Sequence, residues 1–151
     1  MLEVGHLGQD ALEMIRVEHG MPRYGREMGE EFNPLEAGLN SSISYDKGCY
    51  IGQEVVLRLN TYKKVQKHLI GIAFEEGKPE TATHLEVEGK DVGSLTSVVD
   101  SPLLGHALAL GYVRSSFSEV GQEFDVSIVL SDQRWTNVCV GNGPQWRLAS
   151  W

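Results

Sequence analysis

Cys49 is the residue of this sequence with the most distinctive chemistry. It lies between Gly48 and Tyr50, two positions after Lys47. A cation near a thiol favours the thiolate, which can act as a nucleophile, a redox group or a transient metal ligand. A lone cysteine is also commonly buried and inert, and spacing alone leaves both interpretations open. For Cys139, in a Val-Cys-Val run, we expect only the inert role.

Glu18 is a second residue to consider, because a carboxylate has two acceptor oxygens that need partners. It precedes Gly20 at the expected end of a helix, where a negative charge opposes the helix dipole. A partner such as Arg16, Arg23 or a ligand should therefore compensate it. Tyr24 offers an aromatic face close by in the sequence. The alternatives are a surface glutamate and a tyrosine that anchors the core.

Basic residues gather in one part of this acidic chain. The net charge is −8, yet five of the thirteen lysines and arginines fall in one stretch, namely Lys47, Arg58, Lys63, Lys64 and Lys67. One interpretation is a solvated strand or linker edge, where lysines discourage edge pairing. The other is a local binding site for an anionic small molecule. The net charge itself argues against general binding of nucleic acid or anionic membranes, because both need a basic face.

The composition is that of a globular protein, with 41% hydrophobic and 23% charged residues in a chain of 151. No apolar run is long enough to span a membrane and the first residues do not have the pattern of a signal peptide, so we expect a cytoplasmic protein. The two cysteines and five histidines show no ligand spacing. We therefore expect neither a disulfide framework nor a metal site.

The elements that must position these residues begin with a helix over residues 5 to 20. Its apolar stripe consists of Leu7, Ala11 and Ile15, with Leu12 beside it. A glycine followed by a proline then ends the helix, because glycine permits a left-handed cap and proline cannot continue the hydrogen-bond ladder.

The segment around the cysteine is ambiguous. Residues 49 to 59 fit a short helix after a glycine-bounded turn, and a strand through Val55, Leu57 and Leu59 fits as well. Residues 21 to 48 are rich in turn-forming residues. Residues 1 to 60 therefore hold too little patterned apolar surface to fold alone.

From about residue 65 the pattern changes to short apolar runs separated by turns. Six strands at this spacing predict a small antiparallel barrel or sandwich. The turn Gly89-Lys90-Asp91 should join the second and third runs as a hairpin. We place a domain boundary near residues 60 to 66. The six runs are Leu69–Phe74, Leu85–Val87, Val92–Val99, His106–Val113, Phe124–Leu130 and Trp135–Val140.

Three segments, in order, resemble one superfamily. The segment ALEMIRVEHGMPRYG, residues 11 to 25, and the pair Val92–Ser97 and Ala109–Val113 look like the T-protein of the glycine cleavage system and its relatives. The octapeptide KGCYIGQE, residues 47 to 54, resembles the signature of the YgfZ-type proteins of that superfamily. With Asn33–Leu39, the resemblance covers most of the chain from residue 5 to residue 130.

The resemblance implies an α+β fold from a three-domain parent with folate in a central channel. Residues 1–62 would be the C-terminal part of the folate-binding middle α/β domain, which is incomplete here. Residues 63–151 would be the small antiparallel C-terminal β-barrel domain of the T-protein type. The catalytic aspartate of T-proteins would lie in a front half that this chain lacks. The last twenty residues depart from the family's usual apolar ending.

The resemblance also implies site residues and a cofactor, which is tetrahydrofolate or a one-carbon derivative of it. Glu18, in the context Arg-Val-Glu-His-Gly, would bind the pterin, and Tyr24 would pack on it. Lys47 and Arg58 would hold carboxylates of the folate tail. Cys49 is the expected catalytic residue. The residues expected to orient its loop are Gly48, Tyr50, Gly52, Gln53 and Glu54.

Three functions remain open at this point. The first is a folate-dependent YgfZ-like protein that supports assembly or repair of iron–sulfur enzymes through Cys49. The second is an aminomethyltransferase that moves a one-carbon unit to tetrahydrofolate, against which the KGCYIGQE string counts. The third is a non-catalytic truncated scaffold. Expected partners are folate, iron–sulfur proteins, and the missing N-terminal half or a second copy, because residues 1 to 60 should expose apolar surface.

Overall fold

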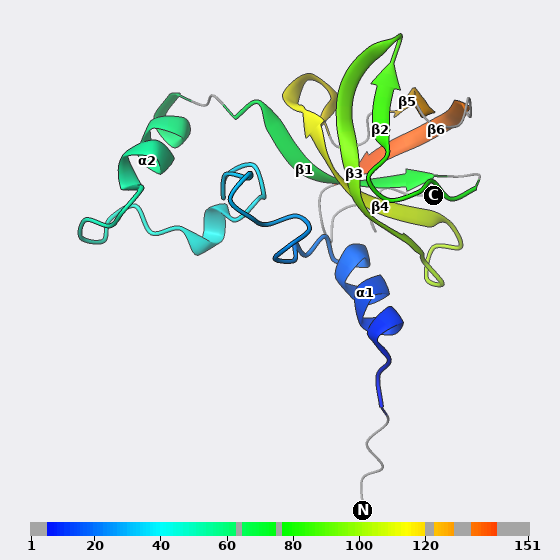
Figure 1. The fold of residues 1–151 in the computed structure, drawn as a ribbon, viewed down its shortest axis with the longest axis horizontal. Coiled ribbons are helices and arrows are strands. Elements are labelled where there is room, and N and C mark those ends of the chain that lie inside the picture. Colours follow the sequence, from blue (N-terminus) through cyan, green and yellow to red (C-terminus); the bar gives the residue numbers. More distant parts are fainter. Residues whose placement is uncertain (1–5, 63–64, 75–76, 120–122, 129–133, 142–151) are drawn as a thin grey trace, which may run out of the picture.

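The computed structural model describes residues 6–62, 65–74, 77–119, 123–128 and 134–141. It consists of an N-terminal arm, residues 6–62, followed by a six-stranded barrel (Figure 1). The arm contains helix α1 (Gln9–Glu18), a short 3₁₀ turn η1 (Asn40–Ser42) and helix α2 (Gln53–Tyr62). Among the described residues, none of the helices is both long enough and apolar enough to cross a membrane.

The six strands close into an antiparallel barrel in the order β1-β4-β3-β2-β5-β6. Each predicted apolar run forms one strand as far as the structure describes it, residues 129 and 130 of the fifth run lying outside the described residues. The small antiparallel barrel expected from the sequence is confirmed. A 3₁₀ turn, η2 (Ser115–Phe117), follows the fourth strand. The strands are β1 (Lys67–Phe74), β2 (His84–Val87), β3 (Lys90–Asp100), β4 (Ala107–Arg114), β5 (Glu123–Ile128) and β6 (Arg134–Gly141).

Strands β1 and β4 are buried on both faces. Alternate residues of β1, Ile70, Ile72 and Phe74, enter the core inside the barrel. On the outer face, Ala73 of β1 and Leu108 of β4 pack in a second cluster together with α1. Because the arm covers the outer face, β4 is buried over its whole length up to its last residue. The barrel therefore has two apolar layers, and α1 covers the outer one with Met14 and Val17.

Two glycine-dependent turns follow the sequence chemistry. Gly20 takes φ +64° and caps α1, as its position before a proline predicts. The hairpin between β2 and β3 is also confirmed, but its turn lies one residue earlier than expected. Glu88 (φ +52°) and Gly89 (φ +74°) form the turn, while Lys90 already pairs with Val87. Positive φ at both central residues matches the twist of the flanking strands, which explains the tight connection.

Helix α1 docks through a different face from the one that the apolar stripe predicts. Met14 and Val17, three residues apart, pack against the barrel. Leu7, Leu12 and Ile15 instead remain 61%, 56% and 42% exposed. The physical reason is that polar side chains of α1 bind the barrel and set the rotation of the helix. The prediction that Leu7 and Ile15 form the buried stripe is therefore wrong.

The ambiguous segment after Cys49 is helical. Gly52, at φ +87°, forms the turn from which α2 starts, and Val56 N–H donates to Gly52 O at 3.3 Å. Figure 1 shows α2 standing away from both the barrel and α1. Ile51 and Val55, beside and within α2, are exposed.

Candidate functional site

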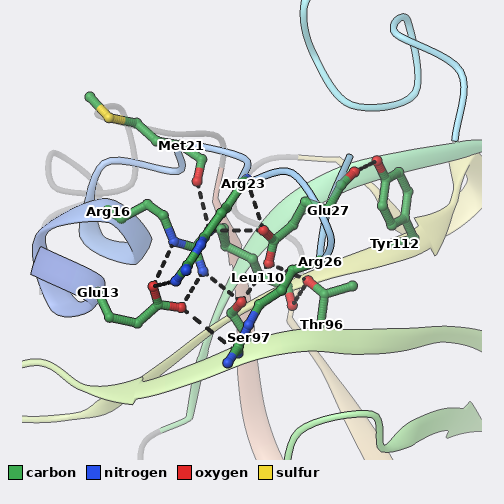
Figure 2. Close-up of polar contacts among 10 residues, drawn as sticks. All are labelled: Glu13, Arg16, Met21, Arg23, Arg26, Glu27, Thr96, Ser97, Leu110 and Tyr112. Carbon is green, nitrogen blue, oxygen red and sulfur yellow. Dashed lines mark hydrogen bonds and ion pairs between the residues drawn. The ribbon is translucent and has the colours of Figure 1, made fainter. Parts of the chain in front are cut away.

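The most elaborate polar cluster joins the arm to the outer face of the barrel, and Glu27 lies at its centre (Figure 2). This side chain is fully buried. One carboxylate oxygen accepts from Arg16 Nη1 at 2.9 Å and from the backbone N–H of Arg23 at 3.0 Å. The other accepts from Ser97 Oγ at 2.5 Å and lies 2.8 Å from Thr96 Oγ1. Both oxygens are thus satisfied, as a buried charge requires.

Arg16 connects this carboxylate to the surface. Its guanidinium donates to both oxygens of Glu13, at 2.5 and 3.1 Å, and to the backbone oxygen of Met21 at 2.8 Å. Arg16 Nη2 also donates to Ser97 Oγ at 2.6 Å, and that hydroxyl in turn donates to Glu27. Helix α1, the turn after it and strand β3 therefore meet at one guanidinium, which sets the rotation of α1.

The charges in this cluster stabilise one another. The hydrogen bonds from Arg16 hold the pKa of Glu13 below its ordinary value, aided by the charges of Arg16 and Arg26. Burial disfavours the charged form of Arg16, but the hydrogen bond with Glu13 and the charge of Glu27 outweigh it and raise the pKa of Arg16. The charged forms of Glu13 and Arg16 are therefore favoured, and the cluster holds the arm on the barrel, since its donors and acceptors are used within the protein.

Glu18, the expected pterin ligand, lies at the end of α1 and is only 8% exposed. One of its oxygens accepts a hydrogen bond from Ser101 Oγ at 2.5 Å. Ser101 in turn accepts from the backbone N–H of Leu104 at 3.2 Å. Within the part of the chain that the structure describes, the second carboxylate oxygen of Glu18 has no hydrogen-bond donor. The compensation expected from Arg16 does not occur, because Arg16 is committed to Glu13 and Glu27.

The loop expected to carry the reactive thiol lies on the surface. Cys49 is an exposed free cysteine, so the buried alternative does not apply. Lys47 Nζ lies 4.7 Å from the centre of the Tyr50 ring, a cation–π contact that orders the start of the loop. Gln53 donates its backbone N–H to Tyr50 O at 3.2 Å. Arg58, on α2, is exposed.

The expected site residues thus fall in two places. Helix α1, which ends at Glu18, lies beside the barrel, whereas residues 47–54 and α2 extend away from it (Figure 1). Tyr24 belongs to the turn between them and is 78% exposed. Cys139 belongs to β6, and its side chain is not among those that the structure describes. The resemblance implies that Glu18 and Cys49 serve one folate-binding site. That shared site stays a prediction.

Sequence reasoning missed Glu27, Thr96 and Ser97. Glu27 lies in a turn-rich segment without periodicity, and the two hydroxyl residues belong to a strand for which the apolar pattern predicts only packing. A usable signal was present. Thr96 and Ser97 are adjacent polar residues inside the apolar run of β3, and buried hydroxyls need partners.

Comparison with known proteins places this arrangement in a family. Residues 67–140 match the family model described as the glycine cleavage T-protein C-terminal barrel domain. An aminomethyltransferase of Desulfitobacterium hafniense is 35% identical over 135 residues, which cover 85% of this chain and 37% of that protein. An aminomethyltransferase of Synechocystis is 38% identical over 125 residues, covering 80% of this chain and 33% of that protein.

A chloroplastic protein of Arabidopsis thaliana, whose name assigns it provisionally to the transferases, is 37% identical over 130 residues, covering 83% of this chain and 30% of that protein. The crystal structure of the glycine cleavage system aminomethyltransferase T from Bartonella henselae has the same fold. It matches with a TM-score of 0.78 at 21% identity, over 89% of this chain and 37% of that chain. The chain belongs to the glycine cleavage T-protein superfamily. It spans about a third of the length of the curated relatives that it matches.

Proposed function

We propose that this chain is the C-terminal part of a tetrahydrofolate-binding protein of the aminomethyltransferase type, which transfers a one-carbon unit to the folate. The relatives named aminomethyltransferase match both the arm and the barrel, because their alignments cover 80% or more of the chain. The KGCYIGQE string alone favours the YgfZ-type branch. The aminomethyltransferase alternative is therefore the better supported of the two folate-binding hypotheses.

The observation that carries this proposal is the half-satisfied carboxylate of Glu18. A carboxylate that is 8% exposed normally has all its acceptors used, yet one oxygen of Glu18 has a described donor, Ser101, and the other has none. The free oxygen fits an N–H donor on the edge of a pterin. A free acceptor at this position supports the proposal of a folate ligand.

In this proposal the chain binds and orients rather than performing the transfer alone. Glu18 accepts hydrogen bonds from the pterin edge, and Lys47 and Arg58 attract the carboxylates of the folate tail. The cluster around Glu27 keeps α1 from rotating, so that Glu18 keeps its direction. Bound tetrahydrofolate would supply the amine that accepts the one-carbon unit. General acid–base chemistry would come from the part of the protein that precedes this chain.

Titration with tetrahydrofolate tests the proposal, with the purified chain alone and with the front part of a related aminomethyltransferase supplied in trans. We expect saturable binding that Glu18→Gln weakens about tenfold, because the substitution removes one charge-assisted hydrogen bond. Glu31→Gln is the matched control, since Glu31 is an exposed carboxylate of the same arm. Equal affinity of the two variants would exclude Glu18 as the pterin ligand, and no binding in either format would leave only a scaffold.

A second candidate function is support of iron–sulfur enzymes, as in YgfZ-type proteins. The exposure of Cys49 on a glycine-flanked loop beside Lys47 favours it, since a thiol that reacts must be reachable. In cells that depend on this protein, Cys49→Ser should lower the activity of an iron–sulfur enzyme while leaving folate binding unchanged. Cys139→Ala serves as the second-cysteine control. Full enzyme activity in the Cys49→Ser cells would contradict this function.

A further inference from the structure

A cleft lies where the chain enters β1 and leaves β4, and we call it the basic cleft. It has a volume of about 470 Å³. Lys67 and Arg114 are directly opposite each other in the antiparallel pair of β1 and β4. Directly opposed side chains point to the same face and lie close together, and like charges in that position destabilise a sheet. The residues that line the cleft are Val65, Gln66, Lys67, Arg114, Ser115 and Ser116.

The two cations have no ion-pair partner in the described part of the chain. The ion pairs there involve Arg16, Arg23, Arg26 and Lys78, and none involves Lys67 or Arg114. Both side chains are exposed. Two exposed cations held face to face at a cross-strand position, without an ion pair among the described residues, are available to an external anion.

The cleft also has a fixed backbone and a spare hydroxyl. Ser115 Oγ donates to Val65 O at 2.7 Å, and Ser115 N–H donates to Gln66 O at 2.9 Å, so the entering and leaving segments are tied together. Ser116 is exposed, and among the described residues its hydroxyl has no partner. A guanidinium fork, an ammonium and a hydroxyl are the donors that a phosphate group accepts best.

We propose that the basic cleft binds the phosphate group of a small molecule. This site is separate from the proposed folate site, because it uses neither Glu18 nor the loop around Cys49. The basic stretch around Lys67 would then bind an anion, which is the second of the two interpretations given for it from the sequence. Arg114 joins this site although it lies far from that stretch in the sequence. A phosphate dianion between the two cations removes their repulsion and gains hydrogen bonds from both.

The test is titration of the purified chain with inorganic phosphate and with glycerol 3-phosphate at constant ionic strength. Succinate is the control anion of similar charge. The variants are Lys67→Met and Arg114→Met, with Lys90→Met as the matched control, since Lys90 is an exposed lysine at the start of β3. We expect saturable phosphate binding that either cleft variant weakens about tenfold and the control leaves unchanged.

Stability without phosphate provides a second readout. Removing one of two facing cations relieves their repulsion, so both cleft variants should unfold at the parent temperature or above it. Binding of glycerol 3-phosphate would assign the cleft to esterified phosphate, and binding of inorganic phosphate alone to the free ion. The proposal is overturned if phosphate shows no saturation, if succinate binds equally well, or if Lys90→Met weakens binding as much as the cleft variants do.

Discussion

Among single residues, Tyr112 shows how the outer face of the barrel contacts the arm. Its hydroxyl donates to the backbone oxygen of Glu27 at 2.6 Å, and its ring stacks on Phe32 with centroids 4.2 Å apart. Burial raises the pKa of Tyr112 well above its ordinary value, and the charges of Glu36 and Glu27 raise it further. The folded protein therefore holds this phenol in its neutral, donating form.

A pH dependence follows from that shift. Because the folded pKa is raised, the contribution of Tyr112 to stability is fully present below the unfolded pKa of about 10. It is lost as the pH rises above that value. Tyr112→Phe should lower the free energy of unfolding by about 1 kcal/mol at pH 7, through the lost hydrogen bond. The substitution should also reduce the fall in the free energy of unfolding at alkaline pH.

Urea unfolding from pH 7 to pH 11 measures both effects. Tyr24→Phe is the matched control, because Tyr24 is 78% exposed and has no described side-chain hydrogen bond. Each variant is compared with the parent at every pH, so that only the effect of the substitution is measured. An alkaline decline as steep in Tyr112→Phe as in the parent would contradict the assignment.

At the scale of elements, the loop that precedes α2 offers two glycines with different roles. Gly52 takes φ +87°, where a side chain is strained, whereas Gly48 does not have a positive φ. At both glycines a Cβ would find no other atom within 4 Å, so space is not the constraint. Gly52→Ala should therefore destabilise α2 by about 1 kcal/mol through backbone strain alone.

Hydrogen exchange of the α2 amides is the measurement, since α2 stands apart from the barrel and its local opening is separable from global unfolding. We expect faster exchange in Gly52→Ala and no change in Gly48→Ala. The same protection of α2 in both variants would mean that the turn adapts. A loss of folate binding in Gly48→Ala with α2 intact would support close approach of a ligand at that glycine.

The elements also show what the sequence could and could not specify. The six strands were predictable because alternation of apolar residues and turn chemistry are local properties, and the Gly20 cap was predictable for the same reason. The rotation of α1 was not. It depends on Arg16 reaching Ser97 and on Glu18 reaching Ser101, contacts between residues more than eighty positions apart. The apolar stripe of Leu7, Ala11 and Ile15 therefore predicted the wrong face, because polar bonds decide which face docks.

The candidate site divides in the same way. Glu18 and the loop around Cys49 could each be found from a short string that resembles a family pattern, and their roles stay predictions. Glu27 could not be found, because nothing in its sequence neighbourhood shows that a turn folds under the barrel's outer face. A buried charge is visible only when its donors, from α1 and β3, have been brought together in space.

For the whole molecule, the cluster around Glu27 determines whether arm and barrel behave as one unit. Without Glu27, the Arg16 side chain is still only 10% exposed, but its guanidinium has lost the buried carboxylate that balances its charge. Ser97 and Thr96 lose an acceptor at the same time. Breaking a buried ion pair in this way costs about 3–5 kcal/mol.

Glu27→Ala should therefore release the arm as well as lower the stability of the fold. Undocking of α1 uncovers the outer face of β4, where Leu108 and Leu110 are buried. We expect a lower urea midpoint, rapid amide exchange throughout α1, and slower exchange retained inside the barrel. Glu31→Ala, an exposed change in the same segment, should leave all three unchanged. If α1 stays protected in Glu27→Ala, apolar packing of Met14 and Val17 holds the arm without the ion pair, and folate binding should then tolerate the substitution.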